Sequence, residues 1–272
     1  MKTLSELQKL TDSQLLDYYR ANPTRWVKCT IPARKLERIV RCTKLINADE
    51  NVSNISRLSY CPSKRLSEGV FNRCSFPKQE MFYGTIYGRD GDEIIEALMT
   101  SIIEVSDLCH YTTYQEEYYV SGEWIVKKDL VTILIYDSSS IAKNSFFKEA
   151  DYLPQQYIAQ HLDETFGDPA IIEAFSHEVK NNSDYRISAS YSNFLFSFSS
   201  IDAIIYPSVR TSQFGTCIAI RPSFVDSGGL ELVATSKYKL YLDGEKSVRA
   251  VAYQHGYVDC ETNRVRYESI TL

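Results

Sequence analysis

Leucines at helical spacing open the chain, at positions 4, 7, 10, 15 and 16. Thr3-x-x-Glu6 and Thr11-x-x-Gln14 both fit capping boxes, which mark helix N-termini. Asn22-Pro23 predicts the end of this helical segment, because the residue before a proline avoids helical geometry. We therefore expect residues 1–34 to form an N-terminal helical extension and residues 35–272 to form the main domain.

Short or alternating apolar runs predict strands through the rest of the chain. They lie at about 25–42, Met81–Ile86, Glu117–Val126, Leu130–Tyr136, Ala203–Ile205 and Thr216–Ile220, with further short runs from about 230. Lys127-Lys128-Asp129 is the predicted turn of one strand pair. Helical patterns cover about 91–108 and most of an insert at about 139–200, with breaks at Pro154 and at Gly167-Asp168-Pro169. This mixed order predicts the α+β class.

The helix at about 91–108 carries a carboxylate at the edge of its apolar face. Its predicted buried residues are Ile94, Ile95, Leu98, Ile102 and Val105. At the helical angular step, Glu104 falls beside Ala97 and Leu108, whereas Glu96 falls on the solvated side. Glu104 is therefore the better candidate for lining a cleft, although a boundary carboxylate can also simply reach out to water.

Composition excludes several classes of protein. The 272 residues are 44% hydrophobic and 24% charged, as in globular proteins, and the net charge of −5 argues against a broad nucleic-acid surface. No apolar run is long enough to cross a membrane, and the polar N-terminus is unlike a signal peptide. The seven cysteines lack a CxxC pair and the four histidines lie far apart, so we expect reduced thiols, a cytoplasmic location and no metal site.

Common catalytic motifs are missing, but several arginines lie near predicted turns. No Rossmann glycine loop, P-loop or G-x-S-x-G elbow occurs. The arginines are Arg41, Arg57, Arg73 and Arg210. Guanidinium groups that converge from separate loops could hold a diphosphate, although each one taken alone is more typical of a surface ion pair. Ser208, in Tyr206-Pro207-Ser208, follows an apolar strand and could face a pocket, although serine is also common in turns.

The segment "NRCSFPKQEMFY", residues 72–83, aligns without gaps with a motif of the RES domain family. That motif is G-R-x-N-x-P-G-x-P-x-x-Y, and Arg73, Pro77 and Tyr83 coincide with it. The departures are Asn72 and Lys78 for the two glycines, Ser75 for the asparagine and Glu80 for the second proline.

The family is named for an arginine, a glutamate and a serine, and the chain resembles it at these positions too. Arg41 in "IVRC" matches the early arginine, with Arg38 as the alternative. Glu104 in "ALMTSIIEVS" matches the glutamate, with Glu96 as the alternative at a shorter spacing. Ser208 in "IIYPSVR" matches the serine, and the resemblance extends over roughly residues 38–240.

The resemblance implies an ADP-ribosyltransferase-like fold, with a split antiparallel β core and flanking helices. It also implies an enzyme that consumes NAD as a substrate and holds no resident cofactor. Members cleave the nicotinamide–ribose bond by hydrolysis or with phosphate, or transfer ADP-ribose. Many are toxins that an Xre-type helix-turn-helix antitoxin neutralises.

Residue roles follow from the resemblance in the same way. Glu104 would stabilise the cation that develops on the ribose, and Arg41 and Arg73 would grip the diphosphate or a phosphate. Tyr83 would stack on nicotinamide or ribose, and Ser208 would hydrogen-bond the amide or a ribose hydroxyl. The further NAD-binding candidates are Arg57 and Tyr206.

Two other functions stay open at this stage. One is an ADP-ribosyltransferase that modifies a protein or nucleotide target. The other, motivated by the four motif departures, is a catalytically silent module that binds NAD or phosphate. The N-terminal extension and the insert at about 139–200 are compatible with homo-oligomerisation or with covering the site.

Overall fold

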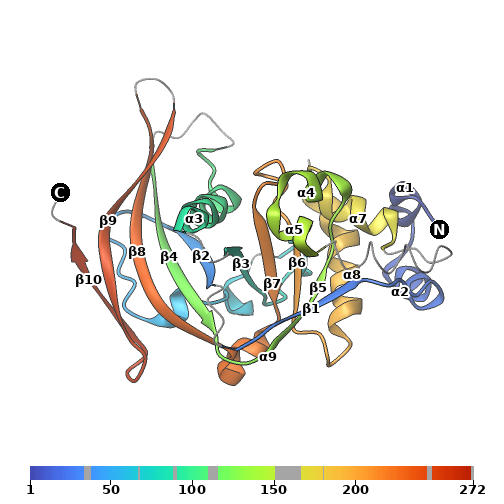
Figure 1. The fold of residues 1–272 in the computed structure, drawn as a ribbon, viewed down its shortest axis with the longest axis horizontal. Helices are drawn as coiled ribbons and strands as arrows, with labels where there is room; N and C mark the ends of the chain where they lie inside the picture. Colours follow the sequence, from blue (N-terminus) through green and yellow to red (C-terminus); the bar gives the residue numbers. More distant parts are fainter. Residues whose placement is uncertain are drawn as a thin grey trace.

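The computed structural model of the chain describes residues 1–33, 38–66, 68–87, 91–109, 116–150, 167–179, 181–243 and 247–270. Its centre is a sheet of ten strands in the order β1-β5-β6-β7-β3-β2-β4-β8-β9-β10 (Figure 1). Neighbouring strands are antiparallel except for β5 and β6, which are parallel. Helices accompany this sheet, so the fold class is α+β, as the sequence predicts.

The elements have the following bounds. The strands are β1 (Val27–Ile31), β2 (Arg38–Leu45), β3 (Phe82–Tyr87), β4 (Glu116–Val126), β5 (Leu130–Leu134), β6 (Ala203–Pro207), β7 (Thr216–Ile220), β8 (Leu230–Leu242), β9 (Val248–Asp259) and β10 (Arg264–Ser269). The helices are α1 (Leu4–Gln8), α2 (Asp12–Ala21), α3 (Gly91–Val105), α4 (Ser138–Lys143), α5 (Ser145–Ala150), α7 (Pro169–Ser176), α8 (Arg186–Phe196) and α9 (Pro222–Phe224). In the ranges that the structure describes, none of these helices combines the length and apolar character needed to span a bilayer.

Most of the predicted elements are confirmed, but two predictions about the strands are wrong. The turn after β4 leads into β5, yet these two strands do not pair. Instead β4 pairs with β2 and β8, whereas β5 pairs with β1 and β6. The C-terminal runs are long strands, because β8 has 13 residues and β9 has 12.

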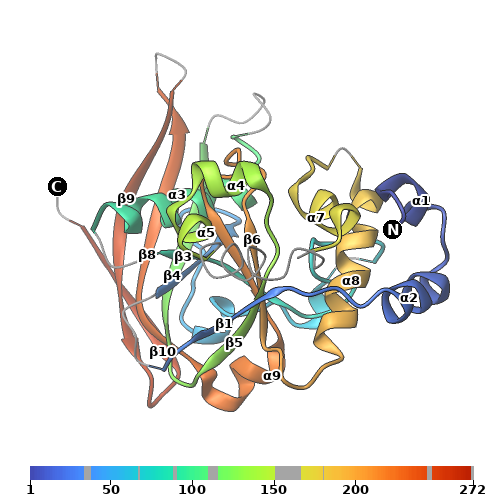
Figure 2. The same cartoon turned by 45° about the vertical axis from the view of Figure 1, so that its right-hand side comes forward.

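The N-terminal helices pack against the helices of the insert. Both predicted capping boxes form, at Thr3 and at Thr11. Figure 2 shows α1 and α2 beside α7 and α8. Residues 1–34 are not wholly helical, since β1 joins the edge of the sheet beside β5.

The start of α7, in the same region, also agrees with the sequence prediction. The predicted break at 167–169 is present, where Asp168 caps α7 and accepts a hydrogen bond from Ala170 N. Pro154, the other predicted break, lies outside the described residues.

The sheet divides where β2 leaves β3. Only Arg38–Val40 of β2 pairs with β3, and the rest of β2 pairs with β4 alone, while Phe82–Thr85 of β3 pairs with β7. Side chains alternate between the two faces of a strand. The face that carries Val40 and Cys42, on which α3 packs, is called the α3 face below; the other face carries Phe82.

The buried side of α3 differs from the predicted one. Ile94, Ile95 and Val105 are 38%, 63% and 38% exposed, so their predicted burial is wrong. The residues that are buried are Ala97, Thr100, Ser101 and Ile102. Small and hydroxyl side chains let α3 approach the sheet closely and hydrogen-bond to strand backbone. Glu104 is half-buried and Glu96 is exposed, as the helical spacing predicts.

One of these helix–strand hydrogen bonds compensates for the missing strand pairing. Ser101 Oγ accepts a hydrogen bond of 2.8 Å from the backbone N–H of Cys42, which lies beyond the paired part of β2. In the same contact Thr85 Oγ1 donates to the carbonyl of Ala97, at 2.8 Å. Because buried backbone groups need partners, these bonds fix α3 on the sheet.

A buried carboxylate ties the C-terminal end of α3 to β4 and β2. Glu117 accepts hydrogen bonds from Ser106 Oγ (2.7 Å), from Tyr119 and from Lys44, which also pairs with Asp107 (2.7 Å). Burial opposes the ionisation of Glu117, but these donors together lower its pKa to about 2. The network holds the segment that follows Glu104.

We predict that Glu117→Gln lowers the free energy of unfolding by about 2 kcal/mol at neutral pH, because it removes charge-assisted hydrogen bonds. Ionised Glu117 stabilises the fold above its usual pKa of about 4.5, and this contribution disappears as the pH falls toward about 2. Urea unfolding should therefore show a difference in unfolding free energy between variant and wild type that becomes smaller as the pH falls from about 4.5 toward about 2. The exposed neighbour Glu116→Gln should change little, and equal effects of the two variants would contradict the prediction.

Candidate functional site

Glu104 lies at the junction of α3 with the ends of β6 and β7. Ser208 Oγ donates to Glu104 Oε1 at 2.5 Å, and Cys217 Sγ donates to the same oxygen at 3.6 Å. Glu104 Oε2 has no hydrogen-bond partner among the described residues. One carboxylate oxygen is thus held by two donors while the other is left for a further contact. Glu104, Ser208 and Cys217 are called the Glu104 cluster below.

The turn between β6 and β7 brings Ser208 to α3. Ser208 N donates to the carbonyl of Gly215 at 2.8 Å, and Ser208 Oγ accepts from Thr211 N at 3.2 Å. A Cβ at Gly215 would lie 2.4 Å from side-chain atoms of Thr100 on α3. Glycine at this position therefore lets the turn rest directly on the helix.

The Ser208 hydroxyl makes two hydrogen bonds inside the protein. It accepts from Thr211 and donates to Glu104, so no proton of this hydroxyl is left for a substrate amide or ribose. The Ser208 hydroxyl thus holds Glu104, and the direct contact with substrate that the resemblance implies would use its remaining acceptor lone pair.

Cys217 was not singled out from the sequence, and its place in β7 gives no signal beyond an apolar run. Cys217 pairs directly with Thr85 of β3 and with Tyr206 of β6, so these three side chains share the α3 face. Burial, and then the charge of Glu104, raise the pKa of the Cys217 thiol well above its usual value. It therefore keeps its proton and acts as a donor.

Tyr83 anchors the loop that carries the matched motif. Its hydroxyl accepts a hydrogen bond from Cys74 N at 3.1 Å and shares one of 2.9 Å with Ser75 Oγ. Burial raises the pKa of Tyr83 well above the usual value, so it stays neutral. Its side chain lies on the α3 face, two residues from Thr85, which contacts α3. The loop is thereby held on the same side of the sheet as Glu104.

Arg73 combines a structural contact with spare donors. Its Nη1 donates to the carbonyls of Ala174 (3.1 Å) and Phe175 (2.8 Å) at the end of α7, and its guanidinium lies 5.0 Å from the ring centre of Tyr185. Within the described part of the chain, Nε and Nη2 make no hydrogen bond. Phe175, whose carbonyl Arg73 holds, has its ring centre 5.7 Å from that of Tyr206, and Tyr206 pairs with Cys217 of the Glu104 cluster.

Arg41 lies on the face opposite to Glu104. It is adjacent to Val40 and Cys42, which point to α3, and its guanidinium lies 5.4 Å from the ring centre of Phe82. It donates to the carbonyls of Tyr83 (2.7 Å) and Ser59 (3.0 Å). Burial lowers the pKa of Arg41 to about 10, so it remains charged. Arg41 therefore binds the backbone of β3 on the face opposite to Glu104.

The remaining candidates divide in the same way. Arg57 pairs with Glu50 at 2.9 Å, and none of its hydrogen bonds reaches the Glu104 cluster. Tyr206 is buried on the α3 face opposite Cys217, with its ring centre 5.7 Å from that of Phe175. The structure thus brings together Glu104, Ser208, Tyr206, Tyr83 and Arg73, and it places Arg41 and Arg57 outside this group.

The chain matches no family model, and no curated protein matches it.

The backbone of the motif loop is strained at one residue. Lys78, which stands where the RES motif has its second glycine, has a φ of 60°. This left-handed region is open to glycine and disfavoured for a residue with a Cβ. Lys78 also makes an ion pair with Glu68, but both side chains are more than half exposed, so the pair contributes little.

We predict that Lys78→Gly is more stable than Lys78→Ala by about 1 kcal/mol, because only glycine relieves the strain at this φ. Both variants lose the ion pair, so the comparison isolates the backbone term. Thermal unfolding of the two variants is the measurement. Equal stabilities would show that the loop does not keep this backbone conformation in solution.

Proposed function

We propose that the protein is an NAD-degrading enzyme that cleaves the nicotinamide–ribose bond by hydrolysis or phosphorolysis. The observation that carries the proposal is the Glu104 cluster. A carboxylate is held by Ser208 and Cys217 through one oxygen, on the face that also carries Arg73 and Tyr83. Of these residues, Glu104, Ser208, Arg73 and Tyr83 are the ones that the RES resemblance groups into one site.

The chemistry suits a fixed carboxylate. Breaking the bond between nicotinamide and ribose develops positive charge on the sugar, as in glycoside cleavage. A carboxylate whose position is set before the reaction stabilises that charge without reorganising. Glu104 Oε2, which has no hydrogen-bond partner in the described ranges, is the oxygen available for this contact.

The sheet offers a second line of support. In an ADP-ribosyltransferase-like fold, which we propose for this chain, the antiparallel core is split. The divergence of β2 from β3 after Val40, with α3 placed over it, is compatible with such a core. The positive φ of Lys78 also supports the match, because it gives the loop a glycine-like turn.

The biological setting is part of the same proposal. We propose a cytoplasmic toxin or defence effector, with an Xre-type helix-turn-helix protein as its antitoxin. In this assignment Arg73 contacts the diphosphate or an incoming phosphate through Nε and Nη2. Arg41 acts indirectly, by supporting the carbonyl of Tyr83.

A binding module without catalytic activity is the second candidate. In its favour, several of the candidate groups are already engaged in hydrogen bonds within the protein. The Ser208 hydroxyl, one Nη of Arg73 and the Tyr83 hydroxyl are all bound to the protein itself. Such a module would bind NAD without releasing nicotinamide. An ADP-ribosyltransferase would instead release nicotinamide and leave a modified macromolecule.

We predict that Glu104→Gln lowers nicotinamide release from NAD by at least about 100-fold, because it removes the charge that stabilises the transition state. Chromatography of reactions with and without phosphate is the measurement, and it also separates ADP-ribose from its phosphorylated product. Glu104→Gln is a cleaner probe than Arg73→Ala, which would free two carbonyls of α7.

Glu96→Gln is the matched control, since Glu96 lies exposed on the same helix. Glu96→Gln should keep wild-type activity, and both variants should unfold within the same temperature range as the wild type. Equal NAD consumption by the two variants would remove Glu104 from the site. Wild-type protein that binds NAD but releases no nicotinamide would favour the binding module.

A further inference from the structure

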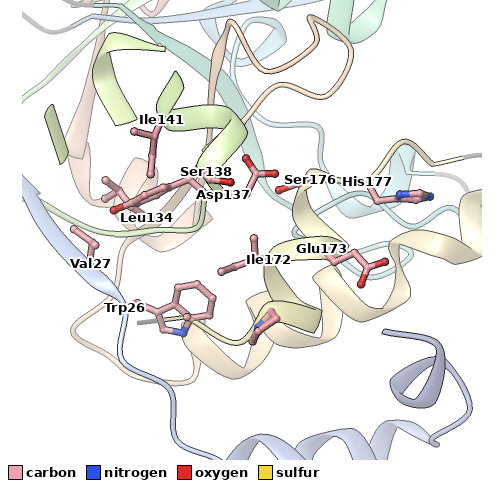
Figure 3. Close-up of a pocket in the computed structure, with 13 residues that line it drawn as sticks. Trp26, Val27, Leu134, Asp137, Ser138, Ile141, Ile172, Glu173, Ser176 and His177 are labelled. Carbon is pink, nitrogen blue, oxygen red and sulfur yellow. The ribbon is translucent and has the colours of Figure 1, made fainter. Parts of the chain in front are cut away.

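A cavity of about 580 Å³ lies beside the Glu104 cluster, between the end of β5 and helices α4 and α7. Its volume falls within the range of about 300–1,000 Å³ that is typical of small-molecule sites. Figure 3 shows Trp26 and Ile172 pointing into it from one side and Ile141 from the other. Most of its wall is apolar.

The polar part of the cavity is a carboxylate beside a buried hydroxyl. Asp137 Oδ1 accepts from Ser140 N and Ser140 Oγ, both at 2.7 Å, whereas Oδ2 receives only a long contact of 3.3 Å from Gln213. Ser176 Oγ is buried and lies close to Asp137 in Figure 3, where its hydroxyl can bond to that carboxylate or to a ligand. Both groups can therefore serve a ligand that brings hydroxyls.

Charge limits which ligand can enter. The described residues that line the cavity include two carboxylates, Asp137 and Glu173, and one histidine, His177, but neither lysine nor arginine. A phosphate group would meet repulsion there, whereas a neutral ring with hydroxyl donors would not.

The cavity is connected to the Glu104 cluster by two short paths. Gln213 contacts Asp137 through its side chain, and its backbone N–H donates to the carbonyl of Ser208 at 2.7 Å. The parallel pairing of β5 with β6 explains this proximity, because their C-terminal ends lie side by side.

The second path runs through α7. Arg73 holds the carbonyls of Ala174 and Phe175, and the next residue, Ser176, lines the cavity. The ring of Phe175 also packs on Tyr206, at 5.7 Å between ring centres, and Tyr206 pairs with Cys217 in the Glu104 cluster. The end of α7 that Arg73 holds therefore connects the cavity wall with the strands that carry the Glu104 cluster.

We infer that this cavity binds the adenosine half of NAD, an inference that rests on the proposed function. A carboxylate that accepts the ribose hydroxyls is a common device of nucleotide sites, and the indole of Trp26 with the apolar walls suits a purine. Adenosine in the cavity, diphosphate at Arg73 and the scissile bond at Glu104 follow the order of groups in the dinucleotide. The nicotinamide end belongs at Glu104, because the reacting carbon must lie against that carboxylate.

Nicotinamide mononucleotide tests the inference, because it contains the scissile bond but lacks adenosine. Ile141→Trp fills the cavity, and Asp137→Asn removes its charge while keeping a residue that caps α4 well. For both variants we expect KM for NAD to rise at least about 10-fold while kcat stays within about two-fold of the wild-type value. This is the pattern expected when the lost contact stabilises the bound substrate and the transition state equally. Their kinetics with nicotinamide mononucleotide should match those of the wild type.

Ala142→Trp is the control, since Ala142 is exposed on the same helix. Saturation-transfer NMR with adenosine gives a readout that does not need turnover: the signal should be present in wild type and the control, and lost in both cavity variants. An unchanged adenosine signal and unchanged KM in the cavity variants would overturn the inference while the proposed function stands. A wild type that cleaves neither substrate would instead refute the proposed function and, with it, the assignment of the cavity to NAD.

Discussion

After Val40, strand β2 leaves β3 and continues beside β4 alone, and the groups exposed by this divergence are satisfied from both faces. On one face the N–H of Cys42 donates to Ser101 of α3. On the other face the guanidinium of Arg41 donates to the carbonyls of Tyr83 and Ser59. Since an unpaired buried backbone group costs as much as a lost hydrogen bond, α3 is fixed where β2 lacks a strand partner. The position of Glu104 follows from that of the helix.

The same divergence explains which sequence predictions succeed on α3. Helical spacing locates Glu104 at the edge of the buried face correctly, because angular position depends on local geometry alone. It fails for Ile94 and Ile95, since it assumes that the apolar side faces the core. Here the helix meets strand backbone that needs a hydrogen bond, so Ser101 faces inward, and Thr100 is buried against Gly215. An apolar pattern contains no information about that need.

Arg41 and Cys217 mark the limit of what the sequence could predict about the site. The strands were predictable one by one, but their partners were not. Strands β4 and β5 are consecutive along the chain, yet they do not pair with each other. Without the register, nothing reveals that Arg41 and Tyr83 point to opposite faces, or that Cys217 lies opposite Thr85. The contact of Glu104 with Ser208 spans 104 residues and depends on the missing side chain of Gly215. Such contacts are set by tertiary packing.

The arrangement has a consequence for how a dinucleotide would be held. Of the two arginines expected to grip phosphate, only Arg73 lies on the side of Glu104, and one of its nitrogens is already committed to α7. In the proposed function, phosphate contact through its remaining edge therefore supplies only part of the binding energy. The same phosphate contact would also fix Arg73 against the carbonyl of Phe175, which is next to Ser176 in the cavity wall. In the same proposal, affinity for NAD would depend on the adenosine end, and Glu104, held through one oxygen, would be left for the bond that breaks.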